Sequence, residues 1–319
     1  MRYGLLLLLL AIAWPARAHH DSAVTRLDLP RTPPPTDSKN AGTQWLSAAA
    51  YEFARYGRVL GASDRVLEDG TIDLHVVALQ SQLRLSDFWS IEMMLPFGVS
   101  TSRPSDGESL RTTGLGDLNL RVTKGWDQKD WGLRAAFGAT LPTGRYEPSN
   151  SLSVAELVTS GQGGLDLVTF DTRASLGADT VALHGAASAW RDAGAARLHA
   201  EFEWVQPLTE TSDEILWGAD AIGRVGVLTR LGDSFFDVAL DYRRHLRDRL
   251  SVIDEAGTVS RERLGGRDDL GVRLDASTAI ASGVRCGVGA RVPMWQRAGS
   301  VQLAQSFSTS LRCGVEVDL

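Results

Sequence analysis

The sequence predicts an all-β protein: a transmembrane antiparallel up-and-down β-barrel of about 12 strands, with 14 as the next alternative, preceded by an extended N-terminal arm. One observation behind this prediction is an export signal at the N-terminus. The other is a series of segments from residue 44 onward in which apolar and polar side chains alternate. After residue 18 no stretch approaches the roughly 18 apolar residues that a membrane-spanning helix needs. We therefore divide the chain into a signal peptide at 1–18, a Pro-rich arm at 19–43 and an outer-membrane β-barrel at 44–319.

The signal-peptide prediction depends on three features of the first 18 residues. Arg2 gives a positive start, Leu5–Trp14 form an apolar run, and Ala16–Ala18 places small residues where signal peptidase cuts. The run is too short to cross a bilayer as a helix, which makes a membrane anchor the lesser alternative. Cleavage removes two arginines and no acid, so the formal net charge changes from −6 to −8. This acidic balance argues against nucleic acid as a partner.

The alternation is clearest at residues 89–99 and 131–141, where the odd-numbered side chains are apolar, as a lipid-facing strand requires. The other expected strands lie at 44–58, 71–85, 114–126, 164–176, 180–190, 195–206, 214–229, 234–247, 268–280, 283–298 and 301–319. These make thirteen strands, whereas single-chain bacterial barrels have an even number. The long polar loops at 144–163 and 248–267 should lie at one end of the barrel, so an even number of strands must separate them. We count five and expect the error in the Ala-rich region 176–200.

The polar turn Asp127–Asp130 predicts a register for the strands on either side of it. If Trp126 faces Trp131, all the pairs on that face are apolar: Val122–Ala135, Leu120–Phe137 and Leu118–Ala139. A soluble β-sandwich is the alternative explanation of such alternation, since each of its sheets has one wet face. The contrast between long and tight connections favours the membrane barrel, as do the Trp residues beside the tight turns.

The last two expected strands carry the two cysteines of the chain. A tight hairpin centred on Gly299-Ser300 makes Cys286 and Cys313 direct neighbours, and it also predicts the pairs Val292–Phe307, Val288–Leu311 and Val284–Val315. Opposed residues lie within disulfide range, and the periplasm is oxidising. A disulfide and two unlinked apolar thiols both fit this arrangement. The alternating terminus that ends at Leu319 resembles the assembly signal of outer-membrane proteins, although the usual final aromatic residue is replaced by leucine.

Two short Gly-rich motifs indicate a family. Thr113-Gly114-Leu115-Gly116-Asp117-Leu118 and Leu141-Pro142-Thr143-Gly144 resemble motifs of outer-membrane transporters grouped as the MetA-pathway of phenol degradation family. The resemblance covers roughly residues 70–319. It implies a barrel that passes small, often hydrophobic or aromatic, molecules, and it carries no binding residues over to this sequence.

The alternation also predicts which side chains face the lumen. These candidates have both signs of charge: Asp117, Asn119, Arg121, Arg134, Glu201, Glu203, Asp237, Asp241, Arg243, Arg285, Arg291 and Arg312. They fit a salt-bridged interior that stabilises the barrel, and they also fit a polar conduit whose charges select solutes. The inward glycines Gly132, Gly138, Gly287 and Gly289 are expected to leave space in the lumen.

Catalytic and metal chemistry have little support in the sequence. The six histidines form no short motif with a serine and an acid, and His199 beside Glu201 is the best candidate for a base. His19 and His20, at the expected mature N-terminus, are weak metal candidates, so we expect no enzyme activity and no cofactor.

The functional prediction is a channel or transporter for small molecules in the outer membrane of a Gram-negative bacterium, reached through a cleaved signal peptide. A non-conducting structural or partner-binding barrel is the alternative, and a barrel hydrolase is a weaker one. The expected partners are outer-membrane lipid, small-molecule solutes and the barrel assembly machinery.

Overall fold

The computed structural model describes residues 43–60, 66–86, 88–105, 108–144, 176–212, 215–253, 259–263, 266–298 and 302–318. The expected signal peptide and nearly all of the expected arm, with His19 and His20, lie outside these ranges, so those predictions remain predictions. Within the described ranges, no helix is long and apolar enough to cross a membrane.

Twelve long strands form one closed antiparallel ring, which confirms the predicted barrel and its predicted strand number. The ring closes because β2 pairs with both β1 and β3, and β1 also pairs with β16. Its strands are β1 (Gln44–Leu60), β2 (Val66–Arg84), β3 (Trp89–Pro104), β5 (Leu118–Asp127), β6 (Trp131–Leu141), β7 (Ala182–Ala193), β8 (Ala196–Pro207), β10 (Asp220–Leu231), β11 (Ser234–His245), β14 (Arg267–Ala281), β15 (Val284–Ala298) and β16 (Gln302–Asp318).

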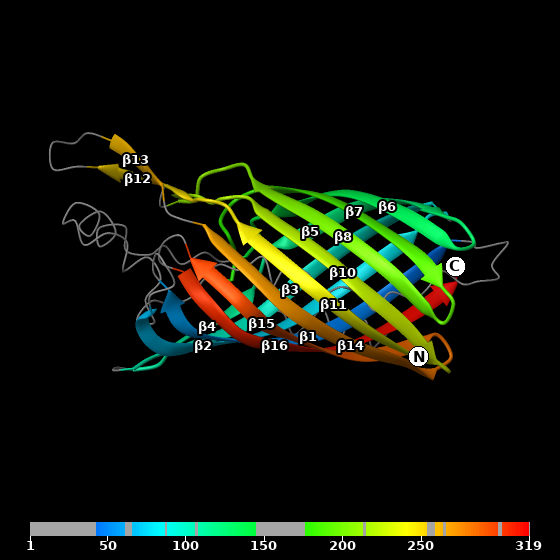
Figure 1. Ribbon diagram of the computed structural model, residues 1–319. Helices are drawn as coiled ribbons and strands as arrows, with labels where there is room; N and C mark the ends of the chain where they lie inside the picture. The colour runs from blue at the N-terminus through cyan, green and yellow to red at the C-terminus, as the bar shows by residue number, and fades with distance from the viewer. Residues whose placement is uncertain are drawn as a thin grey trace, which may run out of the picture.

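Four further short strands lie at one end of the ring. β4 (Leu110–Leu115) pairs with the C-terminal half of β3, and β5 pairs with its N-terminal half. The strand expected at 114–126 is therefore broken at Gly116-Asp117. β9 (Ile215–Leu216), β12 (Arg249–Ile253) and β13 (Val259–Arg263) form a separate small sheet. Figure 1 shows the β12–β13 hairpin projecting beyond the barrel, where the sequence had suggested only a polar loop.

The sequence predicted an odd number of strands because it placed five between the two long connections. Four ring strands lie there, namely β7, β8, β10 and β11. The strands expected at 180–190 and 195–206 are both present, so placing the error in 176–200 was wrong. The fifth expected strand, 164–176, falls outside the described residues except for its last residue, which is a bend.

Connection lengths orient the barrel. The short turns at 128–130, 194–195, 232–233 and 282–283 lie at the same end as the start of β1 and the end of β16. Outer-membrane barrels have short periplasmic turns and longer extracellular loops, so we assign this end to the periplasm. The opposite end, where β12 and β13 project, is then extracellular (Figure 1).

Alternation along each strand separates an apolar outer face from the inner face. Phe137, Phe202, Val238 and Val288 each leave about half or more of their surface exposed on the outside. Trp45, Trp89, Trp126 and Trp131 gather near the periplasmic turns, where an interfacial aromatic girdle is expected. A closed ring with an apolar exterior is a membrane barrel, and the sandwich alternative is wrong.

The register predicted for the β5–β6 hairpin is wrong by two residues. Leu118 pairs with Leu141 and Trp126 pairs with Leu133, whereas the sequence had placed Leu118 opposite Ala139. The faces are nevertheless correct, because a shift of two residues keeps every side chain on its own side of the sheet. The alternation thus predicts which face a side chain lies on, and the geometry of the turn determines which residues pair across the hairpin.

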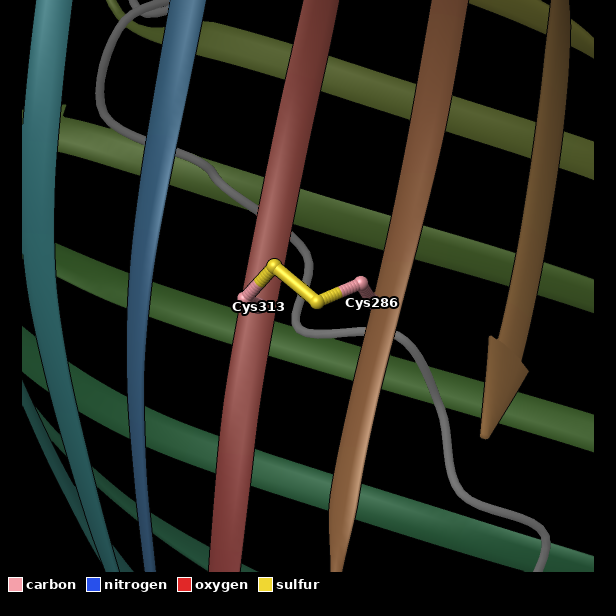
Figure 2. Close-up of a disulfide and its surroundings, with 2 residues drawn as sticks. All are labelled: Cys286 and Cys313. Atoms are coloured by element: carbon pink, nitrogen blue, oxygen red, sulfur yellow. A yellow bond between two sulfur atoms is a disulfide. The ribbon is translucent and has the colours of Figure 1, made fainter. Parts of the chain in front are cut away.

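The register predicted for the β15–β16 hairpin is confirmed where the two strands pair. Val284 lies opposite Val315, and Val288 lies opposite Leu311. The described ladder ends at Arg291, short of the expected pair Val292–Phe307. Between the two valine pairs, Cys286 and Cys313 are joined by a disulfide on the outer face (Figure 2).

Candidate functional site: the barrel interior

The inner face of the ring has two chemically different walls. On β1–β3 many inward side chains are apolar and buried, and together they form what we call the apolar wall: Ala48, Ala50, Ala54, Ile72, Leu74, Val76, Ala78 and Met94. Ala50, Ala78 and Met94, one from each strand, pack against one another at its centre. On β5–β16 the inward side chains include most of the charged groups of the interior, set among small residues, and we call this the polar wall.

Asp241 of β11 lies at the centre of the polar wall and is fully buried. Its carboxylate accepts hydrogen bonds from Arg243 at 2.8 Å and from Arg291 at 2.6 Å, and it lies 3.4 Å from Arg224. Arg224 in turn lies 3.3 Å from Glu201 of β8. Charges of opposite sign therefore alternate across β8, β10, β11 and β15, which compensates the cost of burying each one.

Arg291 of β15 carries this network further around the ring. Besides Asp241, its guanidinium donates to Asp269 of β14 and to the amide oxygen of Gln305 of β16, the latter at 2.7 Å. Gln296 donates to Asp269 at 3.1 Å and to the backbone oxygen of Gln305 at 2.8 Å. The guanidinium fork thus joins three neighbouring strands to β11, as its planar geometry allows.

A second chain of contacts crosses β5 to β8. The Thr140 hydroxyl donates to Asn119 at 2.6 Å and also contacts the His184 ring. The other nitrogen of that ring, Nδ1, lies 3.4 Å from Glu203, which is almost completely buried. Each strand from β5 to β8 contributes one member, so this chain cross-links the wall that faces β1–β3.

Further ion pairs lie on the inner face. Four of them join neighbouring or nearby strands, and the pair Arg273–Asp275 lies within β14: Arg121–Glu92, Arg134–Asp127, His199–Asp237, Arg273–Asp275 and Arg312–Asp275. Arg285 instead donates to the backbone oxygen of Asp233 and lies over the Phe235 ring. Gly132 leaves no free space, because a Cβ there would collide with the Trp190 indole and the Asp127 carboxylate.

Apart from Asp117, each residue predicted to line the lumen contacts another polar group on this face. The main members that the sequence prediction missed are Glu92, Arg224, Asp269 and Asp275. Their strands were expected, but no face was assigned to β10 or β14. In β14 the signal is present, since Asp269, Arg273 and Asp275 recur at even spacing beside outward apolar residues.

His199, the candidate base, lies between two carboxylates rather than beside a nucleophile. Nε2 is 2.8 Å from Asp237 and Nδ1 is 3.5 Å from Glu201. The constellation of Thr140, His184 and Glu203 has the order hydroxyl, imidazole and acid of a hydrolase triad. All three side chains are buried, however, and the Thr140 hydroxyl also donates to Asn119. These contacts fit cross-linking of the wall better than nucleophilic attack.

The two family motifs meet at the break between β4 and β5. The Asp117 carboxylate accepts one hydrogen bond from the Gly144 N–H at 2.9 Å and one from the Ala178 N–H at 2.7 Å. Thr143 strengthens the contact, because its hydroxyl donates to the Gly116 oxygen and accepts from the Leu118 N–H. We call this cluster the clasp. Asp117 was predicted to line the lumen, and the structure shows that it ties the ends of the β6–β7 connection to the wall.

Close backbone packing explains the glycines of the clasp. A Cβ on Gly144 would lie 2.8 Å from Gly177 and 2.9 Å from the Asp117 carboxylate, and a Cβ on Gly177 would meet Gly144 at similar distances. Any larger residue would push the carboxylate away from the N–H groups that it accepts from.

In the described part of the chain, His, Cys, Asp and Glu side chains form no group of three that could hold a metal ion.

Comparison with known proteins agrees with this fold. Residues 39–189 match the family model described as "Putative MetA-pathway of phenol degradation", which confirms the resemblance drawn from the motifs, over a span that starts earlier and ends sooner than expected. No curated protein matches the chain. A COG4313 outer membrane channel from Pseudomonas putida F1 is 14% identical with a TM-score of 0.68, and the match covers 90% of this chain and 100% of that one. A variant of TodX, described as a monoaromatic hydrocarbon channel, is 13% identical with a TM-score of 0.45, covering 87% and 90%.

Proposed function

We propose that this chain, an outer-membrane-type barrel whose residues 39–189 match a phenol-degradation family, is a channel for small apolar or aromatic molecules. The family description and the channel that shares its fold support this class of function. The apolar wall is the observation that carries the substrate class, since a conduit for ions and sugars has no need of an apolar inner surface.

The polar wall supports the same proposal, because its charges are not available to a passing ion. Its charges are bound to one another, as the contacts of Asp241 and Arg291 show. Paired charges stiffen the barrel and offer little to a passing ion, whereas selective pores present rings of charge that face the solute. The substrate that this interior suits best contacts β1–β3 and makes few polar contacts. Because Val76 and Ala78 are almost fully buried, it reaches them only when the side chains that cover them move aside.

Neighbouring valines on opposite faces of β2 allow a matched test. Val76 lies in the apolar wall and is 2% exposed, whereas Val77 faces outward and is 43% exposed. Replacing Val76 by Thr keeps the shape but places a hydroxyl in the apolar wall, at a desolvation cost of about 1–3 kcal/mol. We expect Val76→Thr to slow uptake of an apolar probe such as naphthalene about fivefold or more, and Val77→Thr to leave it unchanged. The proteoliposomes carry an outer leaflet of lipopolysaccharide, because naphthalene crosses a plain phospholipid bilayer without a protein.

A small sugar serves as the second solute in the same vesicles. Its flux should be low in every variant and should not depend on residue 76. Sugar flux as fast as naphthalene flux, or naphthalene flux equal to that of empty vesicles, would contradict the proposal.

A partner-binding barrel remains the second candidate because of one observation, the projection of β12–β13 past the rim (Figure 1). In the described residues this hairpin pairs only with β9 and with no ring strand. Replacing residues 249–263 by a short Gly-Ser linker should leave the uptake of naphthalene intact if the chain is a channel. If cells with this replacement take up naphthalene normally but behave in other respects like cells without the protein, partner binding would be favoured instead.

A further inference from the structure

A row of arginines lies on the outer face of the barrel near its extracellular end. The pairings between strands place Arg55 of β1 opposite Asp73 of β2, Asp73 opposite Thr101 of β3, and Thr101 opposite Arg111 of β4. Arg103 lies two residues from Thr101 on the same face, since side chains on a strand share a face at even spacing. The three arginines are therefore neighbours on one outward patch, which we call the arginine row.

The row carries more positive than negative charge. Asp73 accepts two hydrogen bonds from Arg55, at 2.7 and 2.9 Å, and one from a single terminal nitrogen of Arg103. Within the described part of the chain, Arg111 is in no ion pair. Among the described side chains of this row, the Asp73 carboxylate pairs with two of the three guanidinium groups. Arg55 and Arg103 still expose 42% and 51% of their side chains, whereas Asp73 exposes 6%.

The height of the row matches the edge of the lipid-facing belt. On β1, ten residues separate the periplasmic girdle residue Trp45 from Arg55. At about 3.4 Å per residue and a tilt of roughly 40°, Arg55 lies about 26 Å above Trp45, close to the ~25 Å height of the apolar band in such barrels. Tyr51, Phe53 and Phe307, also on the outer face, lie just below or beside it. The arginines therefore reach the level of the outer headgroups.

We propose that Arg55, Arg103 and Arg111 bind the phosphate groups of an anionic lipid in the outer leaflet. Guanidinium forks match phosphate oxygens in two-point contacts, and such contacts are strong where water is partly excluded. The acyl chains of the same lipid would lie along the apolar outer face directly below, beside side chains such as Val77 and Leu79, which are 43% and 37% exposed. The patch and the belt together fit an amphipathic ligand, whereas a free ion would use only the arginines.

The test uses the full chain in phosphatidylcholine nanodiscs and bis-phosphorylated lipid A as the probe, with binding followed by native mass spectrometry. The wild type should bind this lipid at least tenfold more tightly than the same lipid after removal of its phosphates. The double variant Arg103→Gln/Arg111→Gln should lose about tenfold or more in affinity. Arg55 is left in place because it holds Asp73.

Arg244→Gln is the matched control. Arg244 is also outward, near the extracellular end of β11, but it lies 3.8 Å from its own acid Asp268 and outside the arginine row. The affinity of the Arg244→Gln variant for the lipid should stay within twofold of wild type. A heat-modifiable gel band checks that every variant is folded, and naphthalene uptake by the double variant should stay normal, which separates this proposal from the channel function.

Three results would overturn the assignment. The first is a folded double variant that binds the lipid as tightly as wild type, and the second is an affinity that does not change when the lipid phosphates are removed. Inorganic phosphate that displaces the lipid at equal concentration would mark a free-phosphate site and not a lipid site.

Discussion

Asp241 illustrates how a charged residue is accommodated inside this barrel. Arg224, Arg243 and Arg291 come from β10, β11 and β15, and they meet one carboxylate that water does not reach. A buried ion pair adds little net stability compared with an apolar pair, but breaking one is costly because the remaining charge stays buried. The sequence predicted that Asp241, Arg243 and Arg291 face inward. Alternation cannot say which acid meets which base, so the pairing required the strand order.

The first prediction concerns this residue. Asp241→Asn should lower the free energy of unfolding by about 3 kcal/mol, since the largely buried Arg243 then loses its ion pair with this carboxylate. Urea unfolding in detergent micelles, followed on heat-modifiability gels, measures the loss. The second-site change Arg243→Gln should restore part of the stability. Asp268→Asn, on the outer face, should cost less than about 1 kcal/mol, and an equal effect at the two positions would contradict this account.

The hairpins show which part of an element the sequence determines. For β5–β6 the face was predicted correctly and the register was wrong by two residues, because the four polar residues Asp127–Asp130 permit more than one turn. For β15–β16 the register was correct, because Gly299-Ser300 offered one centre and the cysteines agreed with it. The break between β4 and β5 was not predicted. It depends on the clasp, whose Gly144 and Ala178 are far from Asp117 in the chain.

The disulfide gives a prediction at the level of this hairpin. It closes a loop with a sequence separation of 27 residues, for which chain entropy predicts a stabilisation of about 3.5 kcal/mol. Unfolding in urea should therefore shift to lower denaturant concentration when dithiothreitol is present. The variant Cys286→Ala/Cys313→Ala should unfold near the midpoint of the reduced protein and should not respond to the reductant. A wild-type midpoint that reductant leaves unchanged would show that the link adds no stability.

For the whole molecule, the division into an apolar and a polar wall follows from the strand order. β1, β2 and β3 are adjacent in the ring, so their small and aliphatic inward residues gather on one side of it, with Met94 of β3 packed against Ala50 and Ala78. The alternation in the sequence predicted one apolar exterior and one polar interior. It missed the apolar wall because no face was assigned to the strands at 44–58 and 71–85, where residues such as Val76 and Val77 look the same in sequence whether they face lipid or lumen. Only the exposed neighbours, Val77 and Met93, show which face is outside.

This arrangement predicts weak ion selectivity. In planar bilayers with a tenfold gradient of KCl, the reversal potential of any conductance should lie near zero, because the interior charges are paired with one another. Asp241→Asn should move it toward anion preference, since it leaves an excess arginine inside. Strong selectivity in the wild type would mean that unpaired charges line the path.

The position of the link between Cys286 and Cys313 has a consequence for the order of events during biogenesis. Both sulfur atoms lie on the side of the wall that lipid will cover, between Val284–Val315 and Val288–Leu311. A periplasmic thiol oxidase works in water and must touch the cysteines that it oxidises, so it has access only before the bilayer closes over them. We therefore expect the disulfide to form before the barrel inserts, so that the register of the final hairpin is already fixed when β1 pairs with β16 and closes the ring.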